Sequence, residues 1–153
     1  MTVFEQICAL LDEQGVEYKL SEHALVRTSE EAAKIRGVEL KTGAKAMVIK
    51  AEDTFFLFVL PGDRKIDWKK IKVLLRTKRL RLATEEEAEQ VTRAKVGAIP
   101  PFGNILGLPT YLDKKVLENE WINFNPGSRT HSIAMKSNDL ARLVNPIIEE
   151  FLA

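Results

Sequence analysis

The segment AKAMVIKAEDTFFLFVLPG, residues 44–62, carries a clear structural signal. Two apolar runs, rich in β-branched and aromatic residues, flank a polar turn at Glu52 and Asp53, and a Pro-Gly pair closes the second run. This pattern predicts a β-hairpin. Lys45 stands at the head of the first run, directly before apolar residues, which is an unusual place for a lysine.

Capping signals predict helices on both sides of the hairpin. A threonine precedes a glutamate by three residues in three places: Thr2 and Glu5, Thr28 and Glu31, Thr84 and Glu87. Asp67 is expected to cap a helix through WKKIKVLLR, and Ser137 a final helix, NDLARLVNPIIEEFLA, interrupted at Pro146. Short strands are expected in VEYKL, RLRLA, LPTYLD, WINFNPG and HSIAMK.

The length of 153 residues fits one domain, and no repeat or linker divides it. Strand-like and helical segments alternate irregularly, which argues against a doubly wound sheet. We therefore expect a single α+β domain over residues 1–153. Its mixed, barrel-like sheet would have about seven strands, surrounded by four or five helices.

Composition excludes several classes of protein. Hydrophobic residues at 45% and charged residues at 29% are typical of a globular protein. No apolar run approaches the roughly 20 residues that span a bilayer, and the N-terminus does not look like a secretory signal. The single cysteine, Cys8, excludes an internal disulfide and favours a cytoplasmic location; its apolar helical neighbours favour a core position. Two histidines and one cysteine argue against a zinc site.

The basic residues are concentrated although the net charge is only +1. The stretch RKIDWKKIKVLLRTKRLR, residues 64–81, contains one acid, Asp67, against nine bases: Arg64, Lys65, Lys69, Lys70, Lys72, Arg76, Lys78, Arg79 and Arg81. Such a stretch can form a phosphate-binding face. The alternative is an ordinary solvated helix face.

No nucleophile elbow, P-loop or dinucleotide fingerprint is present. His23 lies in a loop, where it either lines a pocket or forms a local turn, and His131 at a strand start favours a structural role. The Gly- and Pro-rich segment VGAIPPFGNILGLP and the turn FNPGSR would present backbone groups to a ligand. Lys45 could hold an anion, polarise an ester, form a Schiff base, or simply extend to water.

These segments, in this order, resemble the YbaK family, also described as prolyl-tRNA-synthetase-associated or aminoacyl-tRNA editing domains. The resemblance covers nearly the whole chain. It rests on EHALVRTSEEAAKIRG, KTGAKAMVIK, FLFVLPGDRKIDWKKIKVLL, VGAIPPFG and FNPGSRTHSIAMKSNDL.

The resemblance implies a free-standing deacylase that hydrolyses the ester between a wrong amino acid and a tRNA, mostly a proline tRNA, without a metal or cofactor. Lys45 matches the family's catalytic lysine. The substrate-binding positions implied are His23, Gly97, Ile99, Pro101, Gly103, Asn125, Gly127 and His131. Arg64, Lys65, Lys69, Lys70 and Lys72 would contact the tRNA acceptor end, and a synthetase is a further expected partner.

The two loops depart from the family's cysteinyl-editing members. This chain has Gly97-Ala98-Ile99-Pro100-Pro101 and Asn125-Pro126-Gly127 in place of G-x-x-S-P and a Ser/Ala-Gly-Gly turn. Cysteine, alanine, serine and threonine therefore all remain candidates for the amino acid removed. Two other functions also remain open, a non-catalytic tRNA- or synthetase-binding module and a Schiff-base enzyme.

Overall fold

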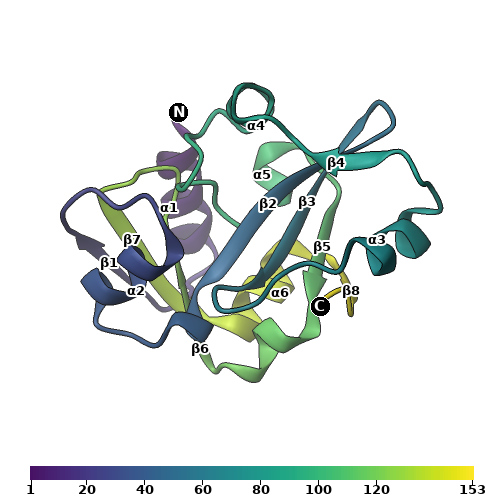
Figure 1. Cartoon of the computed structure of the whole chain (residues 1–153). Helices are drawn as coiled ribbons and strands as arrows, with labels where there is room; N and C mark the ends of the chain where they lie inside the picture. Colours follow the sequence, from purple (N-terminus) through teal and green to yellow (C-terminus); the bar gives the residue numbers. More distant parts are fainter.

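The computed structural model describes residues 1–153 and contains two β-sheets (Figure 1). The larger sheet has the strand order β4-β2-β3-β5-β8, and the smaller one is antiparallel with the order β1-β7-β6. The larger sheet comprises β2 (Ala44–Ala51), β3 (Thr54–Pro61), β4 (Leu80–Leu82), β5 (Thr110–Asp113) and β8 (Ile147–Glu149). The smaller sheet comprises β1 (Tyr18–Glu22), β6 (Trp121–Phe124) and β7 (His131–Lys136).

The predicted hairpin is confirmed as β2 and β3, which pair from Ala44 with Pro61 to Ala51 with Thr54. Neighbouring residues of this hairpin point into two different cores. Val48 and Leu57 belong to a large cluster on one face of the sheet, whereas Ile49 and Phe58 belong to a smaller cluster on the other face. Because both faces are buried, both strands are apolar at almost every position rather than at alternate ones.

The expected barrel is wrong, because the sheets do not close. Only one parallel bridge, between Gly43 and Asn123, joins the large sheet to the small one, beside the start of β2. The strands β4 and β8 end the larger sheet, and each is three residues long. The expectation of a mixed α+β fold holds, and the eight strands are close to the expected number of about seven. They form two open sheets instead of one barrel-like sheet.

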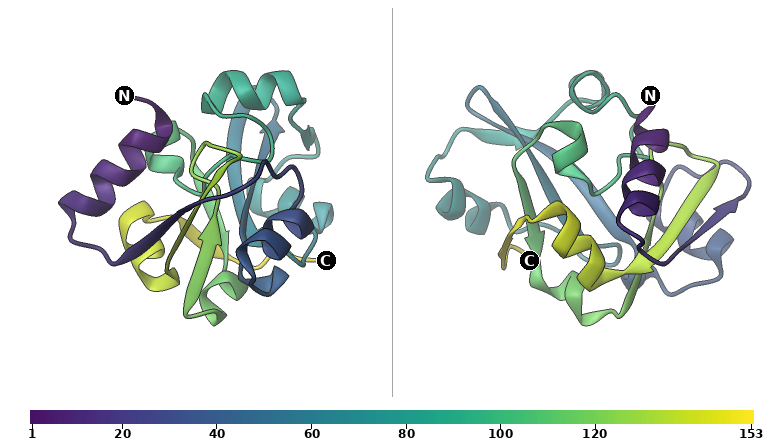
Figure 2. Two further views of the ribbon diagram at one scale, coloured as in Figure 1. Left: turned by 90° about the vertical axis from the view of Figure 1, so that its left-hand side faces the viewer. Right: turned by 180° about the vertical axis from the view of Figure 1, so that it is seen from behind.

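Six α-helices surround the sheets, one more than the upper end of the range expected. They are α1 (Val3–Glu13), α2 (Ser29–Arg36), α3 (Trp68–Leu75), α4 (Glu85–Thr92), α5 (Gly103–Leu106) and α6 (Ser137–Val144), with 3-10 turns η1 (Leu40–Thr42) and η2 (Lys114–Glu118). The small sheet separates α1 from α2 (Figure 2). The predicted capping boxes are present at α1 and α4, and Asp67 caps α3. None of the six α-helices combines the length and the apolar character that a membrane span requires.

The prediction for the C-terminal segment is wrong. The last helix ends at Val144, Asn145 adopts a left-handed conformation, and the residues after Pro146 form β8, which pairs with β5 in parallel. Ser137 does not cap α6, because its hydroxyl donates to the carbonyl of Asn119. The pairing of Ile147 with Tyr111 prevails over the helical pattern, since it lets the fully buried Phe151 pack edge-on against Phe58.

Candidate active site

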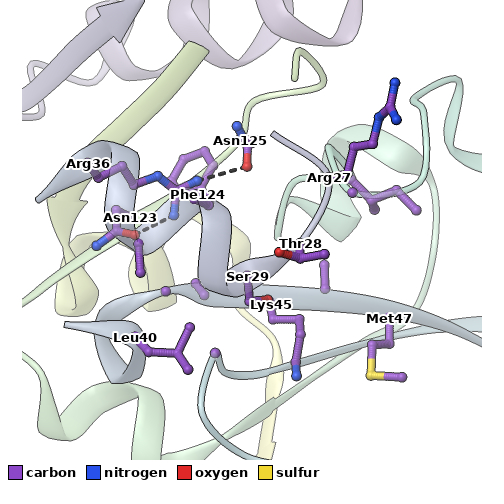
Figure 3. Close-up of a pocket in the computed structure, with 18 of the residues that line it drawn as sticks. Arg27, Thr28, Ser29, Arg36, Leu40, Lys45, Met47, Asn123, Phe124 and Asn125 are labelled. Atoms are coloured by element: carbon purple, nitrogen blue, oxygen red, sulfur yellow. Dashed lines mark hydrogen bonds between the residues drawn. The ribbon is translucent and has the colours of Figure 1, made fainter. Parts of the chain in front are cut away.

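A pocket of about 320 Å³ opens where the two sheets meet (Figure 3). Its lining comes from α2 and the loop before it, from the start of β2, from the loop after α4 and from the end of β6. The lining residues are Arg27, Thr28, Ser29, Ala32, Ala33, Arg36, Leu40, Gly43, Ala44, Lys45, Ala46, Met47, Gly62, Val96, Gly97, Ile99, Asn123, Phe124 and Asn125. The bridge between Gly43 and Asn123 lies at this junction, so each sheet supplies one wall.

Lys45 lines this pocket from β2, opposite Leu60 in the hairpin register. Its side chain is half-buried, and its Nζ donates a hydrogen bond of 3.0 Å to the backbone carbonyl of Arg64. Burial lowers the pKa of the ammonium below its ordinary value, against the opposing influence of Glu30 and Asp63. Lys45 is therefore a partly desolvated amine without a carboxylate bonded to it.

The lining is positively charged. Arg27, Arg36 and Lys45 are its ionisable members, and no aspartate, glutamate or histidine lines the pocket. A pocket of this charge attracts electron-rich groups and stabilises negative charge that develops on an oxygen. It offers no carboxylate or imidazole that could act as a general base.

Arg36 is the residue that sequence analysis missed. Its guanidinium, at the last position of α2, donates to three neutral acceptors: Oγ of Ser132 at 2.7 Å, Oδ1 of Asn123 at 2.6 Å and Oδ1 of Asn125 at 2.8 Å. It forms no ion pair, and burial lowers its pKa to about 10. In the sequence it looked like an ordinary cation in the last turn of a helix, where it would interact with the helix dipole.

The two asparagines that accept from Arg36 are themselves fixed. Nδ2 of Asn123 donates to Oγ1 of Thr42 at 2.8 Å, and Nδ2 of Asn125 donates to the carbonyl of His131 at 2.7 Å. Both asparagines are buried. Asn125 was among the predicted substrate-binding residues, whereas Asn123 was not.

The structure places both histidines outside the pocket lining. His23 lies behind Arg36: its Nε2 is 2.7 Å from Oγ of Ser132, and its Nδ1 is 2.7 Å from the carbonyl of Ala24. Because a carbonyl only accepts, Nδ1 carries a proton, and Nε2 forms the hydrogen bond with the Ser132 hydroxyl. His131 bonds Ser128 through Nδ1 and packs against the ring of Phe4.

The glycine-rich loop after α4 contributes Gly97 and Ile99 to the lining. Neither backbone N–H forms a hydrogen bond within the protein, so both can donate to a ligand. The N–H of Gly127 instead donates to the carbonyl of Ala98 at 2.8 Å, which ties the second predicted loop to the first. Gly97 has φ +92, and a Cβ there would lie 3.2 Å from the carbonyl oxygen of Arg27.

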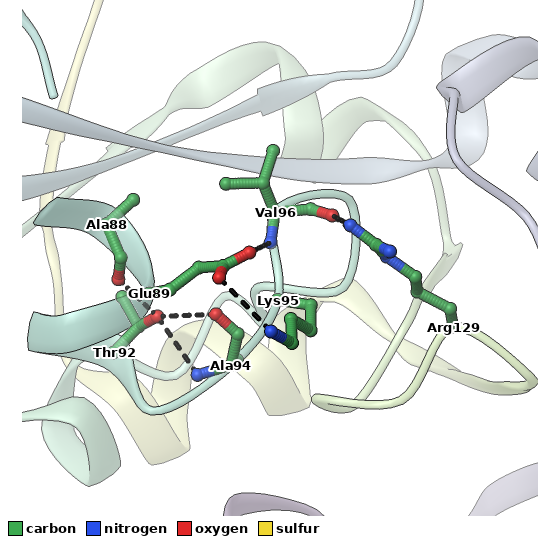
Figure 4. A network of polar contacts seen from close by, with 7 residues as sticks. All are labelled: Ala88, Glu89, Thr92, Ala94, Lys95, Val96 and Arg129. Carbon is green, nitrogen blue, oxygen red and sulfur yellow. Dashed lines mark hydrogen bonds and ion pairs between the residues drawn. The ribbon is translucent and has the colours of Figure 1, made fainter. Parts of the chain in front are cut away.

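Side chains hold this loop at Val96 from two directions (Figure 4). The backbone N–H of Val96 donates to the carboxylate of Glu89 at 3.2 Å, and its carbonyl accepts two bonds from Arg129, at 3.1 and 2.6 Å. Lys95 lies 3.4 Å from the other oxygen of Glu89. The peptide units next to Gly97 are therefore fixed before any ligand binds.

Two further predicted residues lie in the packing behind the loop. Pro101 is buried and does not line the pocket. Gly103 begins α5, and a Cβ on it would collide with the side chain of Thr110. This contact gives Gly103 a packing role.

The predicted tRNA-binding residues divide into two groups. Arg64 and Lys65 follow β3 and lie next to Lys45. The carbonyl of Arg64 accepts the hydrogen bond from Nζ of Lys45, and the positive charge of Lys65 contributes to lowering the pKa of Lys45. Lys69, Lys70 and Lys72 are exposed on α3, which lies on the far side of β3 from α2 (Figure 1). Nζ of Lys70 donates to the carbonyl of Leu152 at 2.7 Å.

Comparisons with known proteins find matches over most of this chain. The model of the aminoacyl-tRNA editing domain family matches residues 23–143. The multifunctional Ser/Thr-tRNA deacylase ProXp-y of Escherichia coli K12 is 30% identical over 152 residues, which cover 96% of this chain and 91% of that protein. A proline–tRNA ligase of Caldicellulosiruptor saccharolyticus is 34% identical over 116 residues, 76% of this chain but only 20% of the ligase.

The fold has a solved counterpart as well. A crystal structure of a protein proposed as a trans-editing enzyme for prolyl tRNA synthetase superposes with a TM-score of 0.86 at 26% identity, covering 100% of this chain and 98% of that one. The family match includes α2, Lys45, the glycine-rich loop and β6, the elements that line the pocket. The chain therefore belongs to the aminoacyl-tRNA editing domain family.

Proposed function

We propose that this chain is a free-standing trans-editing enzyme that hydrolyses the ester of a mischarged tRNA carrying serine or threonine. The coarser statement, an aminoacyl-tRNA deacylase, follows from the family and the names of its relatives. The choice of amino acid is supported by the Ser/Thr-tRNA deacylase, which matches over nearly its full length. A proline tRNA is the first to test, because several of the similar proteins are named for prolyl-tRNA or its synthetase.

The observation that carries this proposal is the half-buried ammonium of Lys45 in a pocket without a carboxylate. Its charge would stabilise the ester carbonyl oxygen as it becomes negative. The unpartnered N–H groups of Gly97 and Ile99 would donate to the same oxygen. This arrangement favours the transition state over the uncharged ester, which is the requirement for catalysis.

The nucleophile in this mechanism is water. It adds to the ester carbonyl carbon, the bond from that carbon to the ribose oxygen breaks, and the leaving oxygen takes up a proton, which yields a free amino acid and an uncharged tRNA. No lining side chain is suited to remove the proton from water. We therefore assign this step to the neighbouring ribose hydroxyl of the substrate, acting within the site.

The size of the pocket supports a small amino acid. A volume of about 320 Å³ lies near the lower end of the range for ligand pockets, which begins at roughly 300 Å³. The tRNA would then remain largely outside and contact the surface around the pocket. Arg64 and Lys65 adjoin Lys45 and would receive the acceptor end, with the α3 lysines further along the same path.

The test is deacylation of tRNA charged with serine, threonine, alanine or cysteine by wild type, Lys45→Ala and Lys45→Arg. We expect Lys45→Ala to lose at least about 100-fold in rate, and Lys45→Arg to lose activity because a guanidinium does not match the ammonium's geometry. Lys50→Ala is the control, since Lys50 is a second half-buried lysine of β2 that instead approaches Glu87. Near-normal hydrolysis by both Lys45 variants contradicts the mechanism, and tRNA binding without hydrolysis by wild type identifies a binding module.

A further inference from the structure

The guanidinium of Arg36, on the pocket wall, has N–H donors that form no hydrogen bond within the protein. A guanidinium has five N–H donors, and three of them are occupied by Ser132, Asn123 and Asn125. The remaining two have no acceptor in the protein, and no carboxylate pairs with the charge. An unpaired charge in a largely buried position is costly, so its presence calls for an explanation beyond bracing α2.

The orientation of this guanidinium is set in advance. Its acceptors Asn123, Asn125 and Ser132 are all buried, and both amides are bonded again through their nitrogens. Ser132 is in turn bonded to His23. Figure 3 shows Arg36 reaching from α2 to Asn123 and Asn125, whereas Arg27 points away from them. A substrate atom can therefore meet the two remaining donors without a rearrangement of the wall.

The lining from α2 and β2 contains four small apolar residues, Ala32, Ala33, Ala44 and Ala46, together with Ser29, Lys45 and Met47. The four alanines leave space for a short side chain and supply no hydrogen-bond acceptor or donor beyond their backbone. Among the donors of this lining, the guanidinium of Arg36 is the one held by three hydrogen bonds to protein side chains. A short side chain that carries an accepting oxygen is complementary to such a wall.

We propose that Arg36 is a specificity-determining residue that binds the side-chain hydroxyl of the amino acid to be removed. The inference rests on the proposed function and deepens it. The hydroxyl oxygen of the substrate accepts hydrogen bonds from the free N–H groups, and the methyl group on the β-carbon of threonine fits against the alanines. A substrate without the hydroxyl displaces water from these donors and forms no hydrogen bond in its place, so it binds less tightly.

Seryl and alanyl esters of the same tRNA provide a sharp test, because the two differ by one hydroxyl. We expect wild type to hydrolyse the seryl ester with a kcat/KM at least about 10-fold higher. Arg36→Gln and Arg36→Lys should bring this ratio close to 1. The ratio is independent of the fraction of enzyme that is folded, because both substrates meet the same active molecules. Arg27→Gln is the matched control, and it should leave the ratio unchanged.

A second measurement uses wild type alone and does not depend on the folding of a variant. Amide analogues of 3′-seryl- and 3′-alanyl-adenosine are titrated calorimetrically, and the seryl analogue should bind at least about 10-fold more tightly. An unchanged kcat/KM ratio in both Arg36 variants, with both rates lowered equally, overturns the inference and makes Arg36 a structural brace. Equal binding of the two analogues overturns it as well. Wild type inactive on every ester overturns the proposed function itself, which is a distinguishable result.

Discussion

Nζ of Lys45 lies 3.0 Å from the backbone carbonyl oxygen of Arg64 and donates a hydrogen bond to it. This bond joins the candidate catalytic residue to the first residue of the basic stretch. The acceptor of this bond is a neutral carbonyl. An ester that binds to the ammonium therefore does not have to displace a carboxylate. The contact therefore connects the chemistry of the site to the path along which the tRNA would arrive.

The first prediction concerns pH. Because burial lowers the pKa of Lys45 in the folded protein, the folded chain releases this proton at a lower pH than the unfolded chain does. The ammonium therefore costs stability at low pH, and this cost disappears as the pH rises from the folded pKa towards the unfolded value of 10.5. Deacylation should decline over the same range, because the charged form is the active one.

Titration of the Lys45 13Cε resonance by NMR measures this pKa directly, for comparison with the ordinary lysine value of 10.5. Rates are corrected for spontaneous ester hydrolysis in the absence of enzyme. If Lys45 titrates at or above 10.5, the burial argument is wrong.

The second prediction concerns the loop held at Val96. Arg129→Ala removes both bonds to the Val96 carbonyl, so the N–H groups of Gly97 and Ile99 should lose their fixed orientation. We expect kcat/KM to fall about 10-fold with little change in melting temperature, since small displacements of catalytic donors are costly. Arg142→Ala is the control, because Arg142 pairs only with Asp139 of its own helix. A loss of stability without a change in the rate would refute this role.

The third prediction concerns Gly97, which combines a positive φ with a close neighbour. Gly97→Ala should destabilise the fold by about 1–3 kcal/mol and displace the loop from the Arg27 carbonyl. Gly107→Ala is the matched variant, because Gly107 has φ +74 and a Cβ added to it would meet no atom within 4 Å. Urea denaturation should show the larger loss for Gly97→Ala, and equal losses would mean that the close approach has no energetic effect.

The fourth prediction concerns the basic stretch. If Lys65 and Lys69 each contact a phosphate, replacement by alanine should reduce the slope of log Kd against log salt concentration by about 1 per lysine. Lys114→Ala is the control, since Lys114 pairs with Glu150 and lies outside the stretch. Slopes equal to that of wild type would assign both lysines to an ordinary solvated surface.

Local patterns predicted the hairpin, two of the three expected capping boxes and the lysine at the head of β2, because these signals lie within a few residues of one another. They did not predict Arg36, whose three acceptors lie 87 to 96 residues further along the chain. The helical expectation after Pro146 failed for a related reason. Periodicity cannot show that Ile147 will find Tyr111 as a strand partner.

The junction between the sheets separates two tasks. Lys45 belongs to the five-stranded sheet. The three acceptors that fix Arg36 lie in the three-stranded sheet or, for Asn125, directly after its strand β6. The two sheets touch at Gly43 and Asn123. Substitutions on the smaller sheet can thus alter which amino acid is recognised while leaving the ammonium in place. An enzyme built in this way can acquire new substrates in evolution, or in the laboratory, without rebuilding its reaction centre.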